Sequence, residues 1–463
     1  MTTKLYAGPA GEPSSDDFSV RIDGQPVFVY QARVSAMPVN QVWPGYQRPL
    51  DQTELASFAY FDTSGPVHVE ITSRRPINSV TIRPLSYGIQ AGVAGQTISF
   101  RLEKPCQVVV EVDDWHNALH LFANPPETNR PAPDEPQVRY FGPGVHEAGL
   151  ITLHTGETLY IAGGAVVHGY VRAENADHVR ILGRGILDAS KVDRSAGGAM
   201  IVLRECAHVQ IEGIVLRDPH VWTVMPAGCR DVHISNIKLI GLWRYNADGI
   251  DVVNSQDILI EDCFVRSFDD SLVVKGLDAY DHYQRFGQDV RNIVWRNCVV
   301  WNDWGRGLEI GAETQAPVME AIAFENCDIV HFVHRAMDIQ HGDRALVRDV
   351  RFEGIRVEKP ITEGARIAGE LYTAEDVGLL IELIIYFTMW NKDAERGRIE
   401  AVRFKDIQIL TERALRVNIA GYDLTHQVRD VTFQNLSWQG RRVEQLAPPD
   451  FTLNEYVQDI LIS

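Results

Sequence analysis

The strongest constraint on the fold is a pattern that the chain repeats eight times after residue 200. Each unit has apolar residues at its first and third positions, Asn, Asp or Gly at the fifth, and apolar residues at the sixth and eighth. Alternating apolar residues point to one face of a strand, and Asn, Asp and Gly are the residues that most readily form a left-handed turn. The first apolar residues of the units are Val209, Val232, Ile258, Ile293, Ile322, Val350, Val402 and Val431.

The spacing of the units favours a solenoid. Most units are 23 to 35 residues long, and 52 residues separate Val350 from Val402. A constant strand–turn–strand core with loops of variable length is expected when coils stack in register. We therefore predict an all-β chain whose main part is a right-handed parallel β-helix, with an earlier coil at 179–186 and the opening coil at 158–165. Three cysteines share one position in successive units and should form an inward column of small apolar side chains. They are Cys263, Cys298 and Cys327.

Two segments precede the predicted β-helix. Residues 1–123 contain short alternating strands at the spacing of an antiparallel β-sandwich. Residues 124–136 contain five prolines and no apolar periodicity, which is typical of a linker. The β-helix is then expected to occupy residues 137–463.

The composition excludes several kinds of partner. The chain has 62 acidic residues against 44 Lys plus Arg, a net charge of -18 that argues against nucleic acid and anionic membranes. The longest apolar run, 379–390, is interrupted by Glu382 and is too short to span a bilayer. The six cysteines lack CxxC spacing, so we expect neither a metal site nor a disulfide framework. The first residues do not resemble a signal peptide, so we expect a cytoplasmic protein, or a secreted one if a leader was removed.

Charged residues gather on the outward face of the third strand of the middle units. The inward pairs of these strands align, and the alignment places the outward residues in columns. Adjacent coils lie about 4.8 Å apart, so Asp248 and Asp270 should be close neighbours, with Asp269 beside them. The columns are Asp248, Asp270, Arg306 and Arg335; Asp251, Val273, Glu309 and Asp338; and Val253, Lys275, Gly311 and Gln340.

A carboxylate cluster of this kind suits glycoside hydrolysis better than it suits folding. Asp is a poor strand former and neighbouring charges repel, although a solvated acidic turn is the simpler alternative. Hydrolysis with inversion needs a protonated carboxyl group at the glycosidic oxygen and a carboxylate roughly 6.5–9.5 Å away that activates water. Crowding raises the pKa of one carboxyl group and so keeps it protonated.

Over its last two thirds the sequence resembles glycoside hydrolase family 28, the polygalacturonases and their relatives. Asn246-Ala-Asp248 matches the Asn-Thr-Asp motif of that family, and Asp269-Asp270 matches its Gly-Asp-Asp motif, with Phe268 in place of glycine. By this resemblance Asp269 is the general acid, and Asp248 and Asp270 hold the nucleophilic water. A sandwich followed by a β-helix is similar also to family 49, the dextranases and isopullulanases.

Two departures from the family 28 pattern favour a neutral substrate over pectin. Arg306 stands where that family has a histidine, and Asp338-Ile339-Gln340 stands where its Arg-Ile-Lys binds the substrate carboxylate. Carboxylates accept hydrogen bonds from sugar hydroxyls but repel a uronate. We therefore expect an inverting hydrolase, exo-acting on a neutral glycan or oligosaccharide. Its predicted substrate-binding residues are Asp251, Lys275, Arg306, Glu309, Asp338 and Gln340.

Other functions stay open at this point. A polysaccharide lyase of the same fold would hold Ca²⁺ with the clustered acids and use Arg306 as base. A non-catalytic carbohydrate-binding β-helix or a glycosyl-transferring enzyme would share the same sequence pattern. For the hydrolase we expect no metal and no cofactor. The sandwich is expected either to cap the β-helix or to add sugar-stacking surface through Trp43, Tyr46, Trp115 and His116.

Overall fold

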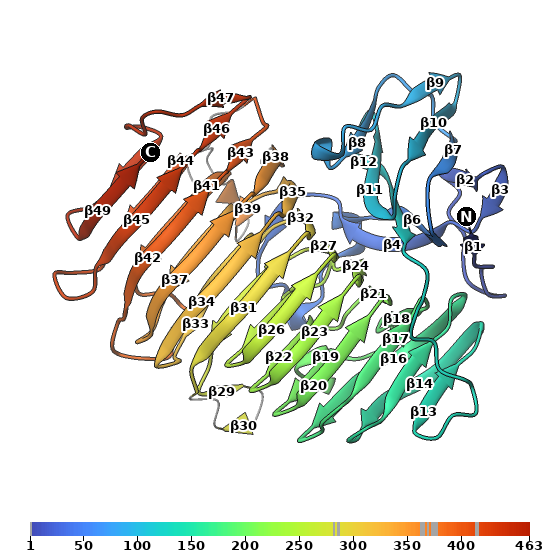
Figure 1. The fold of residues 1–463 in the computed structure, drawn as a ribbon, viewed down its shortest axis with the longest axis horizontal. Helices are drawn as coiled ribbons and strands as arrows, with labels where there is room; N and C mark the ends of the chain where they lie inside the picture. Colours follow the sequence, from blue (N-terminus) through green and yellow to red (C-terminus); the bar gives the residue numbers. More distant parts are fainter. Residues whose placement is uncertain are drawn as a thin grey trace.

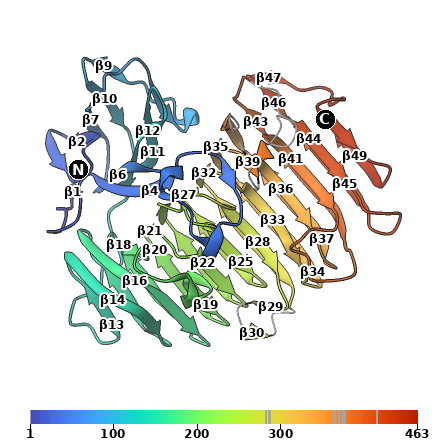
Figure 2. The same cartoon turned by 180° about the vertical axis from the view of Figure 1, so that it is seen from behind.

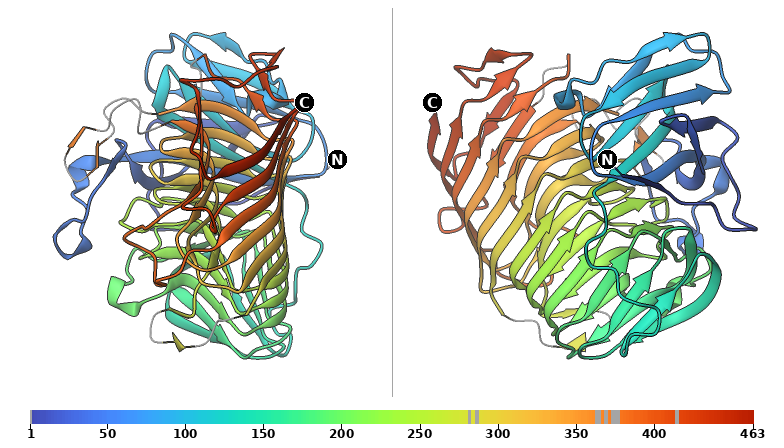
Figure 3. Two further views of the ribbon diagram at one scale, coloured as in Figure 1. Left: turned by 90° about the vertical axis from the view of Figure 1, so that its left-hand side faces the viewer. Right: turned by 45° about the vertical axis from the view of Figure 1, so that its right-hand side comes forward.

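The computed structural model describes residues 2–280, 283–284, 288–361, 366–367, 370–371, 378–412 and 416–463. Its larger part is the predicted right-handed parallel β-helix, and an N-terminal β-sandwich lies beside the coils (Figures 1 and 3). Within these residues no helix is both long enough and apolar enough to cross a membrane.

The sandwich contains two sheets. One consists of β1 (Thr3–Leu5), β4 (Tyr30–Ser35), β6 (Thr53–Thr63), β8 (Val80–Arg83), β11 (Cys106–Val112) and β12 (Asp114–Asn124). The other consists of β2 (Phe18–Ile22), β3 (Gln25–Val27), β7 (Val67–Ser73), β9 (Gly92–Ala94) and β10 (Thr97–Leu102). The predicted antiparallel arrangement is wrong for one pair, because β6 and β12 are parallel. These two strands are far apart in the chain and are not joined by a hairpin, so antiparallel pairing is not required.

The first sheet of the sandwich is buried on both faces. Along β6, Phe58 and Tyr60 belong to the core shared with the β-helix, whereas Ala59 and Phe61 face the second sheet of the sandwich. Side chains alternate between the faces of a strand, so a strand buried on both sides needs a continuous apolar run. Ion pairs such as that between Arg184 of the β-helix and Asp62 (3.1 Å) fix the two parts together.

One long sheet of the β-helix collects the first strand of each coil. Strand β12 ends at Asn124 and β13 begins at Val138, so the proline-rich stretch lies between them; the division into domains at 123 and 137 stays a prediction. The strands are β13 (Val138–Phe141), β15 (Thr158–Ile161), β17 (Arg180–Gly183), β20 (Ala207–Glu212), β23 (Arg230–Ser235), β26 (Gln256–Glu261), β31 (Val290–Arg296), β34 (Val318–Glu325), β37 (Leu346–Glu353), β42 (Arg398–Lys405), β45 (Val428–Gln434) and β49 (Val457–Ile462).

The predicted register is confirmed. All eight first apolar residues pair in sequence, from Val209 with Val232 to Val402 with Val431. The prediction that residues 158–165 form the opening coil is wrong, because β13 belongs to a coil that precedes them and pairs with β15. The sequence of β13, Val138-Arg-Tyr-Phe141, comes soon after the prolines and lacks the turn pattern of the other units.

Inside the β-helix, equivalent residues stack from coil to coil. Cys263, Cys298 and Cys327 are fully buried on successive coils, which confirms the predicted column. The aromatic residues of the third position also stack, with ring centroids 5.0 Å apart for Phe324 and Phe352. Stacked apolar columns of this kind fill the interior of the solenoid without voids.

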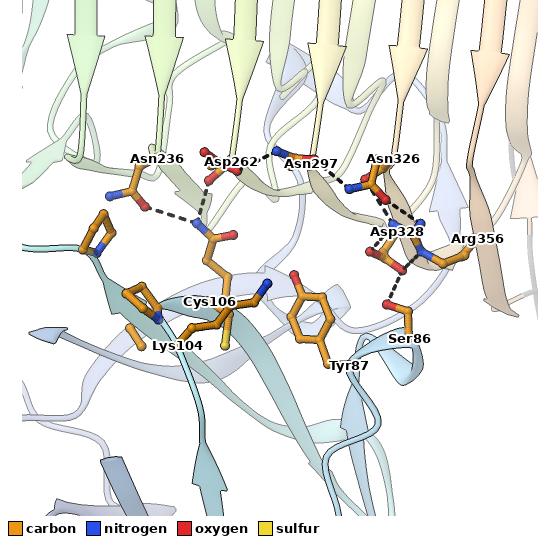
Figure 4. Close-up of a pocket in the computed structure, with 14 residues that line it drawn as sticks. Ser86, Tyr87, Lys104, Cys106, Asn236, Asp262, Asn297, Asn326, Asp328 and Arg356 are labelled. Atoms are coloured by element: carbon orange, nitrogen blue, oxygen red, sulfur yellow. Dashed lines mark hydrogen bonds and ion pairs between the residues drawn. The ribbon is translucent and has the colours of Figure 1, made fainter. Parts of the chain in front are cut away.

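The turn residues form a second ladder, on the outside. All eight predicted Asn, Asp and Gly positions have a positive φ, for example 56° at Asn297. Asn326 donates to Asn297 (2.7 Å), and Asn297 donates to Asp262 (3.1 Å), along the row that Figure 4 shows. This row lines a cavity of about 530 Å³ against the sandwich, where Gln107 donates to the Asp262 carbonyl (2.6 Å).

The other long sheet contains the remaining two strands of each coil. After the turn come β21 (Val215–Arg217), β24 (Lys238–Ile240), β27 (Phe264–Ser267), β32 (Val299–Asn302), β35 (Asp328–Phe332) and β38 (Arg356–Pro360). The third strands, which carry the predicted site, are β22 (Trp222–Ala227), β25 (Ile250–Val253), β28 (Leu272–Gly276), β33 (Arg306–Thr314), β36 (Arg335–His341) and β41 (Leu379–Ile385).

Candidate active site

A cavity of about 420 Å³ opens over the third strands of the middle coils. The three predicted catalytic residues, Asp248, Asp269 and Asp270, all line it. Three of the predicted substrate-binding residues line it as well: Lys275, Arg306 and Gln340. The strand register pairs Val253 with Lys275, Glu309 with Asp338, and Gly311 with Gln340, as the predicted columns require. The third column is interrupted between Lys275 and Gly311, because the register shifts after Val274.

The other three predicted substrate-binding residues lie beneath the cavity. Asp251, Glu309 and Asp338 have no exposed area and do not line it. Their carboxyl groups therefore lie behind Arg306 and Lys275, away from the cavity. In this conformation they offer no oxygen to a bound sugar. Their predicted contact with sugar hydroxyls has no support in the geometry.

Hydrogen bonds to the backbone groups of Asp269 hold the Asp269–Asp270 pair in place. The Asp269 carbonyl accepts from Ser267 Oγ and from Asn302 Nδ2, both at 2.7 Å. The Asp269 N–H donates to the Ala247 carbonyl (3.2 Å), next to Asp248 in the preceding coil. The three Asp residues therefore belong to two coils that are directly bonded to each other, as the motif spacing predicts.

Gly305 lies against this pair from the next coil. Its N–H donates to the Phe268 carbonyl (3.1 Å). A Cβ at this position would come within 2.5 Å of the Asp270 nitrogen and Oδ1, and within 2.6 Å of the Asp269 carbonyl carbon. Real Cβ atoms do not approach other atoms this closely, so the contact requires glycine.

The environment separates the pKa values of Asp269 and Asp270. Burial, together with the charge of Asp270, raises the pKa of Asp269 to about 7. Burial also acts on Asp270, but the charges of Arg306 and Lys275 hold the pKa of its carboxyl below the ordinary value. Asp270 Oδ1 accepts from the Arg306 N–H (3.0 Å) and lies 3.6 Å from its guanidinium. At neutral pH one carboxyl can donate a proton while its neighbour remains ionised.

The pKa of Asp248 is shifted in the same direction as that of Asp269. Burial raises the pKa of its carboxyl well above the ordinary value, and the charges of Asp251 and Asp269 add to this shift. Its Oδ1 has no hydrogen-bond partner among the described residues. Of these three carboxyl groups only that of Asp270 has its pKa shifted downward, which favours Asp270 as the ionised member.

The two cations of the site are paired with acids of the protein itself. Arg306 Nε donates to Asp338 (3.2 Å) and lies 3.9 Å from Glu309. Lys275 Nζ donates to the Gly311 carbonyl (2.8 Å) and pairs with Glu313 (3.2 Å). Because each positive charge already has an anionic partner, the cavity offers little net attraction for a second anion.

Several residues of the cavity wall were missed from the sequence. Arg194 donates to the Tyr245 carbonyl (2.6 Å) and to Asn246 Oδ1 (2.9 Å), so it holds the first motif from the side. Trp222 and Trp390 supply apolar surface, and Trp390 is 38% exposed. Arg194 and Trp390 lie in connections of variable length between the strands, which no repeat pattern marks. Besides Asn246 of the first motif, the other lining residues within the described part of the chain are Asn40, Arg194, Val221, Trp222, Tyr245, Leu277, Ala312, Glu313, Trp390 and Lys392.

Of the aromatic residues suggested for the sandwich, two reach this region. Trp43 is buried and packs on Tyr245 and Phe268, so it adds no sugar-stacking surface. Tyr46 is exposed and stacks on Tyr245, with centroids 5.4 Å apart. His116 lies elsewhere on the sandwich, paired with Glu54 (2.9 Å).

Among the described residues, no group of three or more His, Cys, Asp or Glu side chains is arranged to hold a metal ion. The acidic cluster of the site is instead interleaved with Arg306 and Lys275, whose positive charges would repel a cation.

A parallel β-helix with paired Asp residues on its third strands is the arrangement that the resemblance to family 28 predicts. A family model, Glycosyl hydrolases family 28, matches residues 188–375, which include every predicted site residue. A curated relative, "Probable polygalacturonase" of Vitis vinifera, is 27% identical over 126 residues, which is 27% of this chain and 25% of the relative. The predicted resemblance is thus confirmed for the central coils, and the match spans about a quarter of that relative's length.

Solved structures show the same fold over more of the chain. Dex49A from Penicillium minioluteum is similar over 100% of this chain and 96% of its own, at 14% identity and a TM-score of 0.63. An exopolygalacturonase from Thermotoga maritima is similar over 70% of this chain and 83% of its own, at 17% identity and a TM-score of 0.50. The likeness to Dex49A covers both the sandwich and the β-helix, as the predicted layout requires.

Proposed function

We propose that the protein is an inverting glycoside hydrolase that releases sugar units from a neutral glycan or oligosaccharide. The observation that carries this proposal is the pair Asp269 and Asp270, adjacent on one cavity floor with pKa values shifted in opposite directions. Such a pair supplies the acid and the base that glycosidic cleavage needs. The match of the central coils to the family 28 model supports the same reaction class.

In the proposed reaction Asp269 donates its proton to the glycosidic oxygen as the bond to the anomeric carbon breaks. Asp270 accepts a proton from a water molecule whose oxygen forms the new bond on the opposite face of the sugar. Asp248, whose pKa is raised by burial, orients that water with a hydrogen bond. The leaving sugar departs as a neutral alcohol, the new sugar has the inverted configuration, and the proton balance is restored when the proton on Asp270 returns to Asp269 through solvent.

The pairing of the cations supports a neutral substrate. Arg306 is bonded to Asp338, and Lys275 to Glu313, so a uronate in the cavity would have to displace an existing ion pair. Gln340, at the cavity wall, offers a neutral amide to sugar hydroxyls. Exo action is supported by the cavity walls, to which Asn40 of the sandwich and Trp390 contribute in addition to the strands of the coils.

The test is a panel of substrates. We expect release of sugar from neutral gluco-, galacto- or rhamno-oligosaccharides in preference to polygalacturonate oligomers, with Asp269→Asn as the inactive control. Preferred cleavage of the uronate would overturn the substrate class. An unsaturated product that depends on Ca²⁺ would overturn the hydrolytic mechanism and indicate a lyase.

A further inference from the structure

Residues 36–52 of the sandwich extend across the β-helix beside the catalytic cavity. This segment, named the crossing segment here, contains β5 (Val39–Asn40), η1 (Pro44–Tyr46) and η2 (Leu50–Gln52), and Figure 2 shows it in blue over the coils. Asn40 lines the catalytic cavity. The crossing segment therefore reaches the reacting groups from a part of the chain about 200 residues away in sequence.

The crossing segment is anchored directly behind the proposed acid. The Arg48 guanidinium lies 4.5 Å from the ring of Phe268, the residue before Asp269, and Trp43 packs on the same ring at 6.1 Å. Arg48 also donates to the Trp243 carbonyl (3.1 Å). Phe268 replaces the glycine of the family 28 motif, and its ring supplies the surface on which the crossing segment rests.

A second cavity of about 280 Å³ adjoins the catalytic one. Tyr46 of the crossing segment lines it from one side, and His220 and Arg244 of the β-helix line it from the other. Arg194 lines both cavities, so they are neighbours across a single side chain. The volume is close to the lower end of the range for ligand pockets, which suits one sugar unit.

The walls of the second cavity suit a sugar. Tyr46 is 48% exposed although its ring is held by stacking on Tyr245 and by the Arg194 guanidinium at 4.7 Å. A rigid, exposed aromatic ring is the surface on which an apolar face of a sugar packs. Such a ring requires no ordering when the ligand binds, because its neighbours already fix it.

His220 adds an unmet hydrogen-bonding group. Its Nε2 donates to the Gly197 carbonyl (3.1 Å), so Nδ1 is left as an acceptor. Nδ1 has no partner among the described residues, and the side chain is 1% exposed. Burial lowers the pKa of His220 to about 4, so the ring is neutral at pH 7. A buried acceptor without a partner can take a hydrogen bond from a hydroxyl donor.

The cations at this cavity are occupied by the protein. Arg244 pairs with Asp218 (3.0 Å) and Lys191 pairs with Glu147. Arg194 donates to neutral acceptors of the first motif. The ligand therefore needs no anionic group, and its hydroxyl groups can accept hydrogen bonds from these cations.

We propose that the second cavity is a subsite for the next sugar unit of the substrate, with Tyr46 as its stacking residue. This inference rests on the proposed function and assigns part of substrate specificity to the sandwich. A substrate that is long enough occupies the catalytic cavity, passes Arg194 and places one further unit against Tyr46. The shortest cleavable substrate does not reach Tyr46.

The experiment compares Tyr46→Ala, Tyr46→Phe and Val42→Ala on a length series of the best neutral oligosaccharide. Val42 is 63% exposed on the same segment and lines neither cavity, so its variant is the matched control. We expect Tyr46→Ala to raise KM about 3- to 10-fold for the longer substrates, the size of one aromatic contact, with kcat unchanged. The shortest substrate should show no change, and Tyr46→Phe should behave as wild type.

Two results would overturn the subsite: no effect of Tyr46→Ala at any length, or an equal effect at every length. Affinity measured by calorimetry in the Asp269→Asn background separates this inference from the proposed function. Binding that depends on Tyr46, without cleavage by the wild-type protein, would refute the hydrolase and keep the subsite. The absence of both cleavage and binding would refute both.

Discussion

Replacement of Gly305 by alanine tests the construction of the site most directly. The added Cβ would lie 2.5 Å from the Asp270 nitrogen and Oδ1 and 2.6 Å from the Asp269 carbonyl carbon. Ordinary non-bonded contacts are about 3.5–4.0 Å, so the Asp269–Asp270 pair would have to move by about 1 Å. A displacement of about 1 Å at reacting groups lowers the rate about 10²-fold. We therefore expect Gly305→Ala to reduce kcat by about two orders of magnitude.

The control is an equally crowded glycine that does not line the cavity and follows a strand two coils beyond Gln340. A Cβ at Gly421, after β44 (Arg416–Ala420), would lie 2.5 Å from the Tyr456 carbonyl oxygen and 2.8 Å from its Cβ. Overpacking of this kind destabilises by about 1–3 kcal/mol, so both variants should lose similar stability in urea unfolding. Only Gly305→Ala should lose turnover of the preferred oligosaccharide. A folded Gly305→Ala protein with wild-type kcat would show that Gly305 does not set the position of the two carboxyl groups.

The remaining predictions concern the reaction. Asp269→Asn removes the proton donor and should lower kcat about 10²–10⁴-fold with the fold retained by circular dichroism; near-normal turnover would reject Asp269 as the acid. Because the acid must be protonated and burial raises the pKa of Asp269 to about 7, kcat/KM should fall as the pH rises above about 7. Arg306→Gln removes a charge that lowers this pKa, so the fall should move to higher pH, and an unchanged profile would contradict the assignment. Early product analysis by NMR should show inversion, whereas retention would require a covalent intermediate.

Much of the β-helix could be predicted from sequence because its coils repeat one local rule. The turn at Asn297 and its equivalents need a left-handed residue, and only Asn, Asp and Gly satisfy that need cheaply. A second row of left-handed residues, one position before the first apolar residue of each unit, was missed. In that row Asp257 and Asn292 carry the usual signal, but Ala321 and Ala401 do not. There the stacking of the coils imposes a conformation that the residue itself does not prefer.

The strand register of the candidate site could be predicted, but the burial of its residues could not. The columns containing Asp270 and Glu309 follow from strand alternation alone. Whether an outward-facing residue is exposed depends on the segments that pack over it, and these segments come from elsewhere in the chain. Asn40 of β5 and Trp390 of a loop after β41 border the cavity and belong to no repeat, so the burial of Asp251 and its consequence for pKa had no local signal.

The pairing of Val350 with Val402 indicates that a loop can change in length while the register of the coils is kept. The unit between them is 52 residues long, yet its strands join the same ladder in the same register as units of 28 and 29 residues on either side. A change in loop length is therefore absorbed within one coil and is not transmitted to the next. Loops that border the cavity can lengthen, shorten or be exchanged while Asp269 and Asp270 keep their separation. A lineage of such chains is free to explore new substrates by insertion and deletion, events that would destroy the active site of a fold whose parts all pack on one common core.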